Sequence, residues 1–234
     1  MSARIFTFRI FRYRPGNSES GRFEEAKLSV KPSTTVLDVL EELRGKDPTL
    51  LYRHSCHHGS CGTCACRING SERLACLTRV HDLGTTVVTV EPLRKLGKLG
   101  DLLVDWTDFF LEYPAEWQTL RHSEAHPEAR PPQELSGYSR LENCIECGAC
   151  VSACPVEDFF GPAVLAALNR ERYNRERSDQ EPGDTPERER SLLEMAAHER
   201  GVENCRRALE CSRVCPTAVY PARHIEELRK KLKG

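Results

Sequence analysis

The sequence predicts an α+β protein whose first part is rich in strands and whose second part is all helical. Residues 5–13 and 23–30 alternate apolar and polar side chains, as strands with one buried face do. After residue 132 the strand signal almost disappears, while residues 163–168 and 192–197 are good helix formers. Since the chain has 234 residues, it is long enough for two domains of about 100 residues each.

The first domain is expected to span residues 1–95 and to have a β-grasp layout. A polar turn over residues 14–21 joins its first two strands. The expected elements after those strands are a helix over residues 36–44 capped by Thr34 or Thr35, a cysteine-rich loop over residues 55–66 and a strand over residues 85–90.

A bridge over residues 96–131 and an all-α domain over residues 132–234 are expected next. Within the bridge, residues 99–113 have helical periodicity. Residues 170–190 carry six arginines and seven acidic residues, which indicates either a partner-binding arm or a solvated helix. The second interpretation adds a loop at Pro182–Gly183 and a helix restart near Pro186.

Composition indicates a soluble globular protein without attraction to nucleic acid. The formal net charge is −1, and the chain is 39% hydrophobic and 29% charged. The longest apolar stretch, residues 159–168, is far shorter than the roughly 20 residues that span a bilayer. Residues 1–10 lack the apolar core of a signal peptide. We therefore expect no membrane span, and a location in the compartment of synthesis or on that face of a membrane.

The twelve cysteines carry most of the functional information. Disulfides are not expected in a reducing compartment, so zinc sites, scattered buried thiols and iron–sulfur clusters are the alternatives. Spacing distinguishes them. The first group has the pattern C-x4-C-x2-C followed by a distant cysteine, which is typical of a plant-type [2Fe–2S] ferredoxin. Its expected ligands are Cys56, Cys61, Cys64 and Cys76.

The chemistry of a [2Fe–2S] cluster requires this arrangement. Two bridged irons need four thiolates, and a short loop can supply several of them. Gly59 and Gly62 allow sharp turns that direct amide N–H groups to the sulfurs. Cys66 is left over and is interpreted as a small buried thiol or an alternative ligand. His54, His57 and His58 suggest a Rieske centre, but no cysteine is missing that a histidine would replace.

The second and third groups resemble the two runs of a bacterial-type two-cluster ferredoxin. Residues 144–155 read C-x2-C-x2-C-x3-C-P, in which the fourth cysteine ligates the other cluster. The second run is incomplete because position 208, where another cysteine would stand, is Ala208. Crossing over gives a full [4Fe–4S] set of Cys144, Cys147, Cys150 and Cys215. It leaves Cys154, Cys205 and Cys211, which predict [3Fe–4S], or [4Fe–4S] with a ligand other than cysteine.

These motifs resemble the iron–sulfur subunit of the succinate dehydrogenase and fumarate reductase family, respiratory complex II. Residues 53–64, R-H-S-C-H-H-G-S-C-G-T-C, look like the family signature R-x-S-C-x4-C-G-x-C. Residues 101–110 are similar to its bridging helix. The remaining matches are Asn69–Gly70, Ala75–Cys76, residues 144–155, Gly161–Pro162 and residues 205–216. The resemblance covers nearly the whole chain.

The resemblance implies an oxidoreductase subunit that carries electrons between two partners. One partner is a flavoprotein subunit with FAD, where succinate and fumarate interconvert. The other is a quinone-reactive membrane anchor, whose haem content the sequence leaves open. The implied order is flavin, [2Fe–2S], [4Fe–4S], [3Fe–4S], quinone, at the cytoplasmic face of the inner or plasma membrane. The direction of the reaction, the quinone type and the oligomeric state also stay open.

Departures from the family leave the quinone contacts and the class of complex less defined. Only five residues separate Pro155 from Gly161, where many members have a longer segment with tryptophans. By position alone, the quinone-proximal candidates are Pro155, Phe159, Phe160, Arg206 and Arg207. Alternatives are a subunit of a soluble, for example thiol-coupled, fumarate reductase or other flavoenzyme, and a free ferredoxin-like carrier. No acid–base or nucleophilic catalyst and no G-x-G-x-x-G motif is found.

Overall fold

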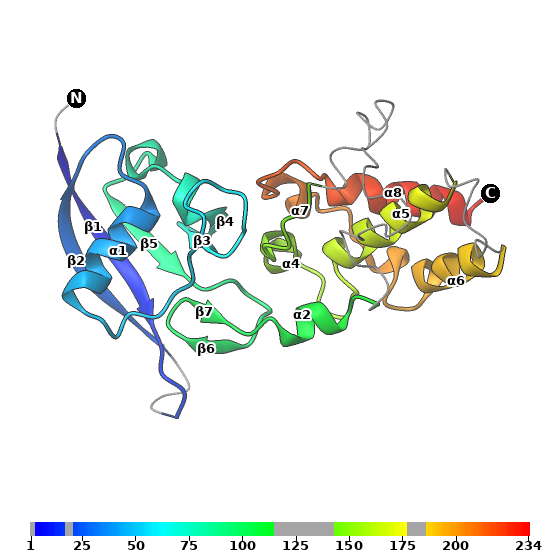
Figure 1. Ribbon diagram of the computed structural model, residues 1–234, viewed down its shortest axis with the longest axis horizontal. Helices are drawn as coiled ribbons and strands as arrows, with labels where there is room; N and C mark the ends of the chain where they lie inside the picture. The colour runs from blue at the N-terminus through cyan, green and yellow to red at the C-terminus, as the bar shows by residue number, and fades with distance from the viewer. Residues whose placement is uncertain (1–2, 17–20, 115–142, 177–185) are drawn as a thin grey trace, which may run out of the picture. The chain divides into compact units, whose positions relative to one another are not determined.

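The computed structural model describes residues 3–16, 21–114, 143–176 and 186–234. Contacts divide the chain into two compact units: Met1–Phe109 with Ile145–Ala153, and Phe110–Cys144 with Cys154–Gly234. The first unit holds a mixed β-sheet and the second holds helices (Figure 1), which confirms the α+β class. The domain boundaries near residues 95 and 132 stay predictions. Within the described residues, no helix is both long and apolar enough to cross a membrane.

A five-stranded sheet with the order β2-β1-β5-β3-β4 forms the first unit. Strand β1, the second in this order, is antiparallel to β2 and parallel to the central strand β5. Phe6, Phe8 and Ile10 of β1 are buried at alternate positions, as expected for a strand with one face on the core. The strands are β1 (Arg4–Arg12), β2 (Arg22–Val30), β3 (Ala65–Ile68), β4 (Ser71–Leu74) and β5 (Val87–Glu91).

Helix α1 (Val36–Lys46) lies over this sheet (Figure 1). Its N-cap is Thr35, one of the two predicted caps. The Asp38 amide donates to Thr35 Oγ1 at 3.2 Å, and the Thr35 amide donates to Asp38 Oδ2 at 2.8 Å. This capping box satisfies two amides that the first turn would otherwise leave unpaired. Val36, Leu37, Val39 and Leu40 are buried, which confirms the predicted apolar face.

The prediction of one helix over residues 99–113 is wrong in its first half. The chain forms a hairpin there, β6 (Lys98–Gly100) and β7 (Leu103–Val104), before the short helix α2 (Thr107–Leu111). Asp101 at the turn has a φ of +38° and a fully buried side chain. The apolar residues that suggested a helix therefore belong to a hairpin, and the buried Asp101 carboxylate stabilises its turn.

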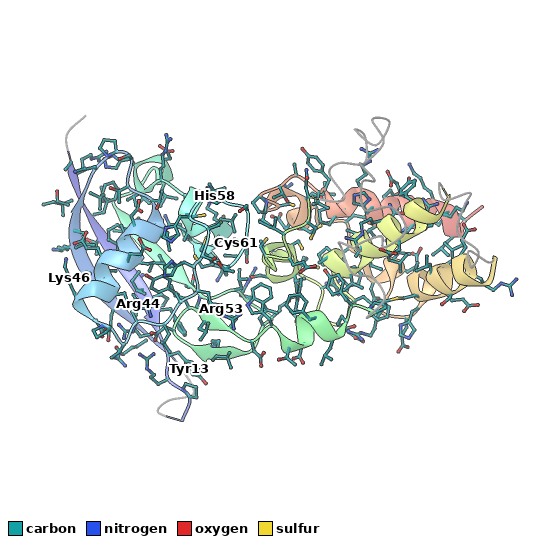
Figure 2. All side chains as sticks on the ribbon, in the orientation of Figure 1. Tyr13, Arg44, Lys46, Arg53, His58 and Cys61 are labelled. Atoms are coloured by element: carbon teal, nitrogen blue, oxygen red, sulfur yellow. The ribbon has the colours of Figure 1, made fainter. Side chains whose placement is uncertain are left out.

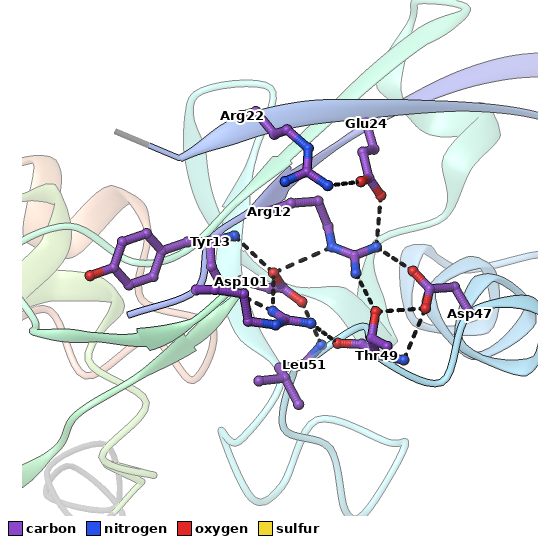
Figure 3. A network of polar contacts seen from close by, with 9 residues as sticks. Arg12, Tyr13, Arg22, Glu24, Asp47, Thr49, Leu51 and Asp101 are labelled. Atoms are coloured by element: carbon purple, nitrogen blue, oxygen red, sulfur yellow. Dashed lines mark hydrogen bonds and ion pairs between the residues drawn. The ribbon is translucent and has the colours of Figure 1, made fainter. Parts of the chain in front are cut away.

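Asp101 is the centre of a polar network (Figure 3). Its carboxylate accepts from the amides of Tyr13 and Leu51, both at 2.8 Å, and from Arg14 Nη1 at 2.7 Å. Arg12 Nε lies 3.3 Å away. Burial disfavours the ionised form, but the Arg14 and backbone hydrogen bonds outweigh it and lower the pKa of Asp101. The network joins the end of β1 to the β6–β7 hairpin.

Helix α4 (Ala149–Ala153) lies in the cysteine run yet packs in the first unit. Ser152 is fully buried, and its hydroxyl donates to Glu72 Oε1 of β4 at 2.8 Å. The same hydroxyl accepts from the Arg94 amide at 2.8 Å. A hydroxyl that both donates and accepts thus fixes α4 against β4.

The second unit is built from helices, as predicted. They are α5 (Pro162–Glu176), α6 (Pro186–Ala197), α7 (Glu210–Arg213) and α8 (Pro221–Leu232). Their core includes Leu165, Leu168, Leu192, Ile225 and Leu228. Helix α6 restarts at Pro186 as expected, while the loop predicted at Pro182–Gly183 lies outside the described residues.

The solvated face predicted for the start of the charged segment is wrong for residues 170–172. Arg170, Glu171 and Arg172 are 4–7% exposed. These side chains have polar partners within the helix: Arg170 Nη2 donates to Glu171 Oε1 and Arg172 Nε donates to Asn169 Oδ1, both at 3.3 Å. Asn169 in turn connects α5 to α8. Asn169 Nδ2 contacts His224 Nδ1 and Glu227 Oε2, both at 2.9 Å. A charged stretch can therefore be buried where it packs against polar partners.

Candidate iron–sulfur sites

The first cysteine group gathers on the loop before β3 and on the 3-10 helix η1 (Ala75–Leu77). The pKa of Cys76 is raised to about 12. Burial is the largest cause, and the hydrogen bond with the Cys64 thiol is the second. Cys56 is also near Cys76, and hydrogen bonding from Ser60 lowers the pKa of Cys56 to about 5. The structure thus brings Cys56, Cys64 and Cys76 together, and Cys61 adjoins Cys56.

Backbone amides point at these sulfurs, as the glycine pattern predicts. The Ser60 amide donates to Cys56 Sγ at 3.3 Å, and the Gly59 amide donates to the sulfur of Cys76. Gly59 and Gly62 have φ values of +83° and +72°, in the left-handed region that favours glycine. Four thiols with converging N–H donors are a donor set that suits an iron–sulfur cluster.

Cys66 and the neighbouring histidines have other surroundings. Cys66 lies in β3 and is 3% exposed, and burial raises the pKa of its thiol. This favours the interpretation as a small buried thiol. His58, labelled with Cys61 on this loop in Figure 2, contacts the Cys56 carbonyl and Ser60 Oγ. His54 and His57 contact each other, with 3.0 Å between His54 Nδ1 and His57 Nε2.

Part of the second cysteine run lies against the first loop within the first unit. A Cβ added to Gly62 would be 2.8 Å from Cys147 Cβ and 2.8 Å from the Ile145 carbonyl oxygen. A Cβ added to Gly148 would be 2.8 Å from the Trp106 ring. Both contacts are too close for any side chain larger than glycine. Cys147 is buried and Cys150 lies on α4, so these two predicted ligands are held next to the first group.

The complete [4Fe–4S] ligand set stays a prediction. Cys147 and Cys150 belong to the first compact unit, whereas Cys144 and Cys215 belong to the second. The Val219 amide donates to Cys215 Sγ at 3.3 Å, which is the type of bond that supports a cluster thiolate.

The third cysteine set surrounds one pocket in the second unit. Cys154, Cys205 and Cys211 all line this pocket, which is partly open to solvent. Burial, followed by the proximity of Cys154 and Cys205, raises the pKa of Cys211 to about 11. Ala208 also lines the pocket, so it stands where a further ligand would be expected. The donor set of three thiols fits the [3Fe–4S] prediction, although the ligand assignment itself stays a prediction.

Four of the five quinone-proximal candidates line the same pocket: Pro155, Phe159, Arg206 and Arg207. Arg207 Nη2 also pairs with Glu226 at 3.2 Å. Phe160 is not among the lining residues. Its ring lies 5.2 Å from the His198 ring and 4.9 Å from the Arg200 guanidinium.

Arg229 is a site-supporting residue that the sequence does not reveal. Its side chain is buried, and it donates to the carbonyls of Val202 and, at 3.3 Å, Cys205. It thereby fixes the backbone that carries one predicted ligand. In the sequence Arg229 begins a basic helix end, Arg229–Lys231, where solvent exposure is the ordinary expectation. The sequence also does not reveal the buried pair of Ser152 and Glu72, because a contact between residues 80 positions apart leaves no local pattern.

Comparison with known proteins connects this architecture to a family. A family model described as a 2Fe-2S iron-sulfur cluster binding domain matches residues 7–111, and a 4Fe-4S dicluster domain matches residues 140–219. The fumarate reductase iron-sulfur subunit of Mycobacterium tuberculosis is 35% identical, over 94% of this chain and 90% of the relative. The succinate dehydrogenase iron-sulfur subunit of Coxiella burnetii is 32% identical, over 97% and 96%. The chain belongs to the family of succinate dehydrogenase and fumarate reductase iron–sulfur subunits.

A solved structure agrees with this membership and confirms the resemblance. A chain of the Mycobacterium smegmatis Sdh1 complex in the apo form matches with a TM-score of 0.77 and 26% identity, over 99% of this chain and 96% of that one. As an iron–sulfur subunit of this family, the chain is an electron-transfer component of an oxidoreductase complex and carries [2Fe–2S] and [4Fe–4S] domains. The predicted cofactor class is therefore confirmed.

Proposed function

We propose that this subunit passes electrons between an FAD-containing flavoprotein, where succinate and fumarate interconvert, and a quinone-reactive membrane anchor. The observation that carries the proposal is the pocket shared by Cys154, Cys205 and Cys211, with Ala208 in the place of a fourth thiol. In the order that the family resemblance implies, the three-thiolate site comes last, next to quinone. The relatives include both a fumarate reductase and a succinate dehydrogenase subunit, so the proposal leaves the direction of the reaction open.

The three ligand sets in this proposal are those that the spacing predicts. We assign [2Fe–2S] to Cys56, Cys61, Cys64 and Cys76, [4Fe–4S] to Cys144, Cys147, Cys150 and Cys215, and [3Fe–4S] to Cys154, Cys205 and Cys211. The parallel pairing of β1 with β5, together with the overlying α1, supports a β-grasp, plant-type ferredoxin domain. The two crossed runs support an all-α, bacterial-type two-cluster domain.

The chain itself holds, spaces and insulates the electron-carrying sites. When bound, iron–sulfur clusters supply one-electron carriers that the amino acids do not provide. Gly62 lets the first cysteine loop approach Cys147 without an intervening side chain. Amide donors at Cys56 and Cys76 stabilise negative charge on the sulfurs. The Trp106 ring lies directly against Gly148, so an apolar side chain covers this part of the second run.

The quinone end is assigned to the pocket residues Pro155, Phe159, Arg206 and Arg207, and Phe160 stays a candidate by position. An arginine beside an apolar pocket can donate to a quinone carbonyl, and Arg206 is exposed at this pocket. The complex would lie at the cytoplasmic face of the membrane, held there by the anchor subunit.

Purification of the native complex tests the proposal. A complex extracted from membranes with detergent should contain FAD and quinone together with this chain, and should transfer electrons from succinate to a soluble quinone. Arg206→Ala should slow the quinone reaction severalfold. It should leave succinate-dependent reduction of an artificial acceptor unchanged, because the proposed role of the pocket is in the quinone step and not in the reaction at the flavin. Loss of both activities to the same degree would contradict the assignment of the pocket.

A soluble, thiol-coupled fumarate reductase is the second candidate. The specific observation that favours it is the short Pro155–Gly161 segment, since a longer segment carries the quinone-contacting tryptophans in many members. Fractionation separates the two candidates. A native complex that stays in the supernatant after ultracentrifugation and contains no quinone would support the soluble enzyme.

A further inference from the structure

We propose a binding site for a zinc-like divalent metal ion on the surface of the first unit, formed by Glu41, His54 and His57. Glu41 lies on α1, and the two histidines flank Cys56 on the cluster loop. His54 Nδ1 and His57 Nε2 are 3.0 Å apart, and each lies 3.5 Å from Glu41 Oε1. The site goes beyond the proposed function and does not depend on it.

The triangle of donor atoms has the dimensions of one face of a metal tetrahedron. Zinc binds nitrogen and oxygen at about 2.0–2.1 Å, so two ligand atoms of a regular tetrahedron are about 3.3 Å apart. The observed separations of 3.0, 3.5 and 3.5 Å lie on either side of this value. The three separations therefore allow an ion about 2 Å from each atom, with a fourth position left for water or another ligand.

The side chains are held in this arrangement by their neighbours. The His54 ring stacks on Tyr52, with 5.3 Å between ring centroids and 29° between planes. Tyr52 in turn lies beneath the Arg44 guanidinium at 5.4 Å, and Arg44 is one turn from Glu41 on α1. The three side chains that form the site are 30–44% exposed, so an ion can reach them from solution.

Hydrogen bonding alone accounts for only part of this geometry. One N–H between His54 and His57 explains their 3.0 Å contact. This hydrogen bond does not involve Glu41. Glu41 Oε1 lies 3.5 Å from His54 Nδ1 and 3.5 Å from His57 Nε2, beyond the usual range of an N–H···O bond. Two imidazoles and a carboxylate are a common set of zinc ligands, and one bound ion would coordinate all three side chains at once.

Zinc uptake by the cluster-loaded full chain tests the site. After equilibrium dialysis against Zn²⁺, the wild type should retain one zinc per chain with its iron content unchanged. Zinc X-ray absorption should show nitrogen and oxygen neighbours at about 2.0 Å and no sulfur. His54→Ala and His57→Ala should abolish this uptake, and Glu41→Gln should weaken the affinity at least tenfold.

His58→Ala is the matched control, because His58 lies on the same loop but contacts Ser60 and the Cys56 carbonyl. It should bind zinc as the wild type does. Glu41→Gln lies outside the cysteine loop, so it tests the site even if a loop variant loses its cluster. Equal zinc uptake by wild type and the Glu41 variant, sulfur neighbours at the zinc, or loss of iron as zinc binds would each overturn the proposal.

Discussion

Ala208 is the single residue on which the cluster inventory depends most. It lines the pocket with Cys154, Cys205 and Cys211, and it is exposed to that pocket between two residues with positive φ, Arg207 and Leu209. A thiolate at this position would therefore meet an open space rather than a packed core. The sequence identified this position because the interval between cysteines in a ferredoxin run is fixed by the geometry of a cubane.

Ala208→Cys is expected to convert a [3Fe–4S] site into a [4Fe–4S] site. The added thiolate brings negative charge, so the reduction potential should fall and electron transfer to quinone should slow severalfold. EPR of the oxidised protein is the measurement, since the [3Fe–4S] signal should disappear. Ala208→Val, which adds bulk but no ligand, should keep the signal. A wild type without an oxidised [3Fe–4S] signal would contradict the assigned three-ligand set.

Gly62 is the residue at which the first cysteine loop comes closest to the second run. Its φ is +72°, and a Cβ added there would be only 2.8 Å from Cys147 Cβ, so both features exclude a side chain. Gly84 has a similar φ of +67° but nothing within 4 Å of an added Cβ. Gly62→Ala should therefore destabilise the protein by about 1–3 kcal/mol more than Gly84→Ala.

Thermal unfolding of the cluster-loaded chain measures that difference between Gly62→Ala and Gly84→Ala. The Gly62 variant should also weaken the magnetic interaction between the first two clusters, because the loop must move away from Cys147. Equal unfolding temperatures for the two variants would show that the close approach is not needed. The sequence predicted the turn at Gly62 but not its neighbour, since a tertiary contact across about 85 residues has no local pattern.

Among the elements, the pair formed by α5 and α8 has a built-in pH dependence. His224 of α8 is 6% exposed, with Nε2 3.1 Å from the Val219 carbonyl and Nδ1 2.9 Å from Asn169 Nδ2. The ring must therefore accept from Asn169 and donate to Val219, which is a neutral imidazole. Burial lowers the pKa of His224 and outweighs the opposing effect of Glu227.

A lowered folded-state pKa means that the unfolded chain binds the proton more tightly. Stability from His224 is therefore complete above the unfolded value of about 6.5 and is lost as the pH falls through the lower folded value. The local free energy of opening of α5 and α8 should decrease by up to about 1.4 kcal/mol per pH unit in that window. Hydrogen exchange, corrected for the intrinsic rate, measures it. His224→Gln should remove the slope, whereas the exposed control His198→Gln should retain it.

Local sequence patterns predicted the elements that bury one apolar face, but not the element whose conformation depends on a buried polar side chain. Alternation identified β1, and the apolar face and Thr35 cap identified α1. The hairpin β6–β7 was missed because its turn depends on Asp101, whose partners Tyr13 and Leu51 are about 50 to 90 residues away. Apolar spacing does not distinguish such a turn from a helix.

At the scale of the whole molecule, the cysteine run of the second part is divided between the compact units. Residues 145–153 pack with the sheet through Ser152 and Glu72, while Cys154, Cys205 and Cys211 line a pocket of the helical unit. The spacing of cysteines predicted three ligand sets but contained no information on this division. Folding of the helical part is therefore expected to depend on clusters as well as on its apolar core.

Iron content and the loss of one ligand test this dependence. The protein isolated without oxygen should contain about nine iron atoms per chain and no zinc that is bound through sulfur. Cys150→Ser should remove the [4Fe–4S] EPR signal, leave the [2Fe–2S] signal, and increase the protease sensitivity of the helices α5–α8, because metal–ligand bonds organise this part. Cys66→Ser is the matched control, since this buried thiol lies outside the three sets and should keep all signals. About six iron atoms in the wild type, or a Cys150 variant whose helices remain as resistant as before, would show that the crossed ligand sets are wrong.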